Sequence, residues 1–182
     1  MMNRNVWRAV QSGILVLVFG IGVFADEGNH HSTNLSGIIN DHTSVAAGSW
    51  EVHGVWSMKL KGDSGKADFS AVLTMERSDY WAFITPGANP DARTAHTHHI
   101  TLVDGAVTPI ANGFEVSGMA AFTGNGNPAP FGQYAPVLID ITGGTSVTFS
   151  NIKLILQGAA AGHFGSLPLA GAVRRSTDVG GH

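Results

Sequence analysis

Apolar and polar residues alternate with a period of two over residues 50–61 and again over residues 66–77. Successive side chains of a β-strand point to opposite faces, so this alternation predicts two strands that each bury one face. Residues 62–65 (GDSG) have turn chemistry, which predicts an antiparallel hairpin. On its inner face we expect Val52, Trp56, Met58, Leu60, Ala67, Phe69, Ala71, Leu73 and Met75.

The rest of the chain repeats this pattern in shorter segments and has no long stretch with helical periodicity. The chain is therefore expected to be all-β, a single antiparallel β-barrel of eight or nine strands, with a β-sandwich as the alternative. The barrel is favoured because strands of 10–12 residues are long for a sandwich. Further strands are predicted at residues 80–85, 96–103, 106–110, 114–123, 137–141, 145–157 and 167–173.

The first 25 residues have the order of a secretory signal peptide. Arg4 and Arg8 precede an uncharged apolar run at residues 13–24, and Ala25 ends a segment that a signal peptidase could cleave. The run is shorter than the roughly 20 residues that span a bilayer. We therefore expect cleavage, no membrane span in the mature chain, and a secreted or periplasmic location; an uncleaved anchor is the alternative.

Composition divides the remaining chain into three parts. Residues 26–49 are polar and predict a flexible arm, residues 50–173 form the expected barrel domain, and residues 174–182 form a polar tail. The net charge of -3 offers no positive field for nucleic acid. A surface with few charges and many glycines is compatible with self-association into a homo-oligomer.

Three histidines occur within residues 96–99 (HTHH), at the start of an expected strand. Alternation places His96 and His98 on the face of Ile100 and Leu102, with His99 on the other face. The chain has no cysteine, so a transition-metal site must use His, Asp, Glu or Met. Imidazoles two positions apart can converge on one ion, and neutral imidazole suits Zn, Cu, Ni or Fe. The pair predicts a metal site at the barrel mouth; histidines hydrogen-bonded without a function are the alternative.

Such a site needs at least one further ligand. His163 ranks first because residues 158–165 form a glycine-flanked loop that can fold over a barrel end. Glu115 ranks second and His53 third. A three-His or two-His-one-carboxylate site would keep one position open for water or substrate, which leaves a catalytic role undecided. Metal affinity is expected to fall as the pH drops through about 6.5, because the ligands must be neutral.

Residues 54–56 (GVW) resemble the Gly-x-Trp entry of lipocalins, secreted eight-stranded barrels that bind apolar small molecules. The resemblance covers three residues and implies an alternative function, the binding of an apolar small molecule inside the barrel. Residues 174–182 offer no counterpart to the helix that follows the last lipocalin strand, so the chain is assigned to no family. A third hypothesis is a non-enzymatic module for surface contacts or self-association.

Overall fold

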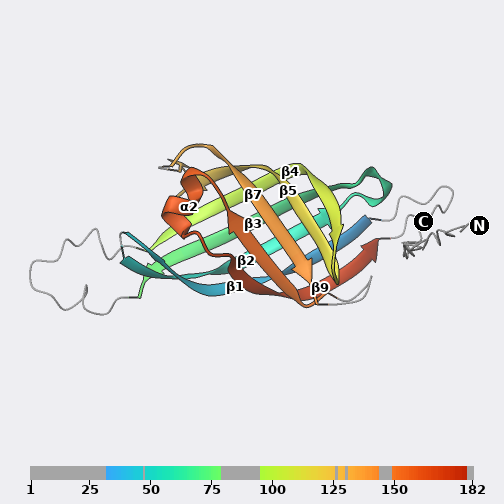
Figure 1. Cartoon of the computed structure of the whole chain (residues 1–182), viewed down its shortest axis with the longest axis horizontal. Coiled ribbons are helices and arrows are strands. Elements are labelled where there is room, and N and C mark those ends of the chain that lie inside the picture. The colour runs from blue at the N-terminus through green and yellow to red at the C-terminus, as the bar shows by residue number, and fades with distance from the viewer. Residues whose placement is uncertain are drawn as a thin grey trace, which may run out of the picture.

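A computed structural model describes residues 32–46, 48–78, 95–125, 127–129, 131–143 and 149–179. Over these residues the chain forms one closed antiparallel β-barrel with one short α-helix (Figure 1). The strands of the barrel are β1 (Ser32–Val45), β2 (Gly48–Leu60), β3 (Lys66–Arg77), β4 (His96–Ile110), β5 (Gly113–Gly124), β7 (Tyr134–Thr142), β8 (Asn151–Leu156) and β9 (Leu169–Val179). The short elements are the 3-10 helix η1 (Gly62–Ser64), the strand β6 (Asn127–Pro128) and the helix α2 (Ala159–Phe164).

The eight strands follow the order β4-β3-β2-β1-β9-β8-β7-β5, and pairing of β4 with β5 closes the sheet. The prediction of a single antiparallel barrel is therefore confirmed. Ser32 pairs with Val179, so β1 begins and β9 ends at the same end of the barrel. Helix α2 lies at the opposite end, between the end of β8 and the start of β9 (Figure 1).

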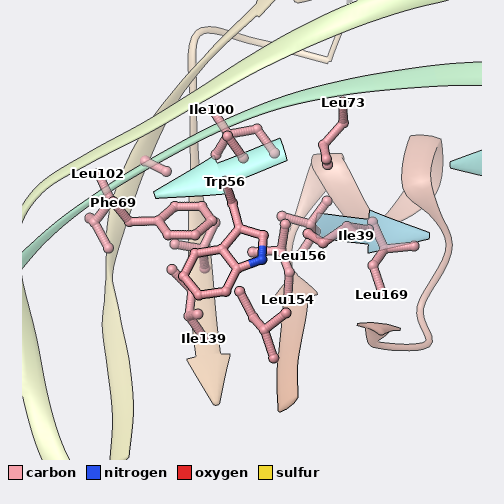
Figure 2. Packing of buried hydrophobic residues seen from close by; sticks show 14 of the residues in the cluster. Ile39, Trp56, Phe69, Leu73, Ile100, Leu102, Ile139, Leu154, Leu156 and Leu169 are labelled. Atoms are coloured by element: carbon pink, nitrogen blue, oxygen red, sulfur yellow. The ribbon is translucent and has the colours of Figure 1, made fainter. Parts of the chain in front are cut away.

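Inward-facing side chains fill the middle of the barrel, and a cavity of about 580 Å³, lined in part by Leu35, Met58 and Leu102, lies toward the end away from α2. Trp56 from β2 stacks on Phe69 from β3, with ring centroids 6.2 Å apart, in the middle of the apolar cluster (Figure 2). The predicted hairpin is present as β2 and β3, and its alternation holds from Val52 to Met75. Burial of each large apolar side chain contributes about 1.5–3 kcal/mol, so this filled interior is the main source of stability.

The segment expected to be a flexible arm forms strand β1 over residues 32–45, so that prediction is wrong for the described residues. Leu35, Gly37 and Ile39 point inward and are buried. An added Cβ at Gly37 would collide with the Ala172 carbonyl oxygen and approach Trp56 Nε1. The close approach of the Ala172 carbonyl, with the indole beside it, therefore requires glycine at this position, and this glycine interrupts the apolar alternation that would identify a strand.

Residues 174–179, expected in the polar tail, continue strand β9, so that prediction is also wrong. They pair with the first residues of β1, and the register shifts between Ser36 and Gly37. Arg174 and Arg175 are exposed. Backbone hydrogen bonds to β1, rather than an apolar face, hold this segment in the sheet.

Two smaller expectations also change. The segments 96–103 and 106–110 form one continuous strand, β4, with a bulge in place of the predicted turn at Asp104, whose φ is 54°. The predicted strand at residues 80–85, the signal peptide at residues 1–25 and residues 144–148 lie outside the described residues. None of the helices in the described ranges is long and apolar enough to cross a membrane.

Candidate metal centre

Two histidines at the start of β4 point into the end of the barrel that α2 occupies. His98 is buried, with 1% of its surface exposed, and His96 is half-buried. His99 lies on the outer face and is exposed, as the alternation predicts. The backbone here is fixed by Asn125, whose side-chain oxygen accepts the Thr97 N–H at 2.9 Å and whose own N–H donates to the Thr97 carbonyl at 2.7 Å.

The third histidine comes from α2. Residues 158–165 were expected to form a loop, but their alanines favour a helix, which begins and ends beside Gly158 and Gly165. Both glycines have positive φ, and an added Cβ at Gly165 would collide with Thr43 Oγ1. Phe164 is buried completely and seats the helix against the barrel, which brings the adjacent His163 to the histidines of β4.

The Nε2 atoms of the three rings converge. His163 Nε2 lies 2.9 Å from His98 Nε2 and 3.1 Å from His96 Nε2. The three potential ligand atoms all lie within 4.8 Å of one another. Two nitrogens bound tetrahedrally to zinc at about 2.0–2.1 Å would be roughly 3.3 Å apart. The two pairs that include His163 are within a few tenths of an ångström of this spacing, whereas the remaining pair, at up to 4.8 Å, would have to close by as much as about 1.5 Å for the rings to surround one ion.

A backbone carbonyl fixes the tautomer of His98. Its Nδ1 lies 3.2 Å from the Thr123 carbonyl oxygen, which can only accept a hydrogen bond. In the neutral ring Nδ1 therefore carries the hydrogen, and Nε2 turns its lone pair toward His163. A metal-binding histidine is commonly oriented in this way by a carbonyl on its other nitrogen.

The environment favours the neutral form of His98 and His163. Burial is the largest cause that lowers the pKa of His98 to about 4, and the nearby His163 and His96 lower it further. Burial, and then His96, lower the pKa of His163 to about 4. Both rings are thus unprotonated well below pH 6.5, so protons would compete with a metal at these two histidines only at a lower pH than the sequence predicts.

Aromatic rings enclose the three histidines. Phe164 lies 4.8 Å from His98, Phe131 lies 5.2 Å from His163, and Trp50 lies 5.2 Å from His96, measured between ring centroids. These rings exclude water and lower the local dielectric, which strengthens any charge interaction in the site.

The lower-ranked candidate ligands lie elsewhere. Glu115 is on the outer face of β5, nine residues along the strand from Gly124, which pairs with His98. That separation is about 30 Å by strand rise, so the prediction of Glu115 as a ligand is wrong. His53 is on the outer face of β2 and does not join the group either. The predicted choice of His163 as the third member of the cluster is confirmed.

Two parts of the site escaped sequence analysis. The Thr123 carbonyl carries no sequence signal, because every residue presents a carbonyl. Phe164 follows His163 directly, and its role depends on the helix that the flanking glycines concealed. Comparison with protein-family models, curated proteins and solved structures found no match to this chain.

Proposed function

We propose that the protein binds one transition metal ion, Zn, Cu, Ni or Fe, through His96, His98 and His163, with one coordination position open. The convergence of three Nε2 atoms in a buried, neutral site supports this function. Three protein ligands and an open position are typical of catalytic zinc sites, where the metal activates water or polarises a substrate.

Hydrogen bonds among the three histidines do not by themselves explain why the rings cluster. A hydrogen bond between two imidazole nitrogens uses one proton, and a hydrogen on His163 Nε2 can point at only one neighbour at a time. A cation among the three rings would accept all three lone pairs together. We also propose that the protein is exported, which fits its signal-like first 25 residues and a site built without thiolates.

The alternatives have less support. An apolar ligand in the middle of the barrel would have to displace side chains such as Trp56 and Ile139, which are buried there. The space that remains for such a ligand is a cavity of about 580 Å³ toward the end away from α2, lined in part by Leu35, Met58 and Leu102. Self-association through a strand edge loses its basis in the described part of the sheet, because β4 and β5 close it. Size-exclusion chromatography across a range of concentrations would test self-association directly.

Metal titration tests the proposal. Protein without a His tag, stripped with a chelator, should bind one Co(II) per chain, detected by its visible absorption, and Zn(II) should displace it. His163→Ala should lower the affinity by on the order of 100-fold or more, because even the loss of an outer hydrogen-bond partner costs about 10–100-fold. His99→Ala, on the exposed face of the same strand, should bind as wild type does. Equal affinity of wild type and His163→Ala would refute the site.

A further inference from the structure

We propose that the ligand of the open metal position is a small carboxylate, which binds the metal through one oxygen and accepts the Trp50 indole N–H through the other. This specificity depends on the metal site proposed above. It assigns a role to Trp50 that the metal ligands alone do not require.

The first support is charge. Three neutral imidazoles leave the full charge of a divalent ion uncompensated, and an uncompensated charge in an apolar site is unfavourable. Among the residues that the structure describes, the group that could hold the metal contains no carboxylate. Glu51 and Glu76 lie on the outer face and are exposed, and the oxygens of Asp41 accept the backbone N–H groups of His42 and Ala170. An anion in the fourth position would supply the missing negative charge.

The second support is a buried donor beside the site. Trp50 faces inward at the start of β2, and its ring meets that of His96 edge to face. Its Nε1 is buried and has no hydrogen-bond partner within the described part of the chain. Buried donors are rarely left unpaired in folded proteins, and an acceptor bound at the metal would pair this one. Arg77, 5.3 Å from the centroid of the Trp50 ring, adds positive charge to the same end.

Carboxylate chemistry matches both features. Its two oxygens share one negative charge, so one can bind the metal while the other accepts a hydrogen bond. A single-atom anion offers no second oxygen for the indole. The rings of Phe131 and Phe164 border the histidines and suit an apolar group attached to the carboxylate.

Trp56 provides a matched control. Its Nε1 is also buried without a hydrogen-bond partner among the described residues, but the ring lies deep in the core among aliphatic side chains (Figure 2). A ligand at the barrel mouth would not reach it. The two tryptophans thus share the unpaired donor and differ in their position relative to the histidines.

The test is an acetate titration of the Co(II)-loaded protein, followed by visible absorption. Acetate should change the wild-type spectrum. Trp50→Phe should weaken acetate binding about tenfold or more, as expected for the loss of a hydrogen bond to a charged acceptor, while Co(II) affinity stays within about twofold. Trp56→Phe should bind acetate as wild type does.

Each other outcome has a distinct meaning. Failure to bind Co(II) would refute the metal site itself. Co(II) binding with a spectrum that acetate does not change would refute only the carboxylate ligand, and equal acetate affinity in Trp50→Phe would refute the role of the indole. Should Trp50→Phe fail to fold, the indole ¹H–¹⁵N signal of Trp50 in Zn(II)-loaded wild type decides: it should shift with acetate while that of Trp56 does not, and an unchanged Trp50 signal would overturn the proposal.

Discussion

The two ends of the barrel both gather polar side chains, but in opposite ways. At the end of the barrel that carries the β2–β3 connection, Lys61 Nζ lies 2.7 Å from Asp68 Oδ1 and 2.6 Å from Asp104 Oδ1. All three side chains are accessible to water. At the α2 end, three imidazoles face one another inside a wall of aromatic rings. The ion pairs are complete in themselves, whereas the potential metal-binding group at the α2 end, as far as the described residues show it, consists of imidazoles and includes no carboxylate. Like groups buried together indicate a ligand site, and paired charges at a surface turn do not.

The largest expected effect tests whether packing builds the histidine end. Phe164→Ala should lower the free energy of unfolding of the metal-free protein by about 3–5 kcal/mol, because it empties a fully buried aromatic site. Urea unfolding measures this change. Leu167→Ala, at an exposed position nearby, should stay within about 0.5 kcal/mol of wild type. A difference below about 1 kcal/mol between the two variants would mean that α2 is not held by its core contact.

A second prediction uses pH to separate the two ends. The pKa of His98 is lowered from 6.5 to about 4 in the folded protein. Between these values the unfolded chain binds a proton that the folded chain excludes, so stability is complete above about pH 6.5 and is lost as the pH falls toward 4. At about 1.4 kcal/mol per pKa unit, the loss from His98 is on the order of 3 kcal/mol.

Urea unfolding of the metal-free protein at pH 7, 5.5 and 4 measures this loss. His98→Asn removes the titrating ring while its amide can still donate to the Thr123 carbonyl, so its stability should fall less with pH. His99→Asn, on the outer face, should keep the wild-type profile. Parallel profiles for wild type and His98→Asn would contradict a neutral, buried His98.

The smallest effect is expected at the opposite end. Lys61 is exposed, and its side chain chiefly lowers the pKa of Asp68 by hydrogen bonding. Water and salt screen such surface pairs, so Lys61→Met should change the urea midpoint much less than Phe164→Ala does at neutral pH. The change should be smaller still in about 0.5 M salt, where the Debye length is below about 5 Å. Its Co(II) affinity should equal that of wild type. A midpoint change as large as that of Phe164→Ala would show that this end, too, depends on its polar groups.

Sequence patterns predicted the parts of the fold in which large side chains carry the signal. The β2–β3 hairpin alternates without interruption, and the same rule placed His96 and His98 inside and His99 outside. The inward-facing histidine pair was therefore predictable, because strand geometry alone decides the face on which each ring lies.

Other parts have no local signal. Gly37 must be glycine because the Ala172 carbonyl of β9 and the Trp56 indole of β2 approach it closely, and this relation joins three strands. The polar end of β9 is a strand because β1 pairs with it, not because of its own residues. Glu115 was chosen for its chemistry, but its position along β5 depends on the register with β4, which composition does not reveal.

The shared end at which β1 begins and β9 ends has a practical consequence. Both chain connections leave the barrel on the side away from the histidines. A fusion partner, a fluorescent label or a surface linkage could therefore be attached through either strand without covering the histidine end of the barrel. Protein immobilised in this way would present that end to the solution, a suitable orientation for measuring ligand capture by surface methods.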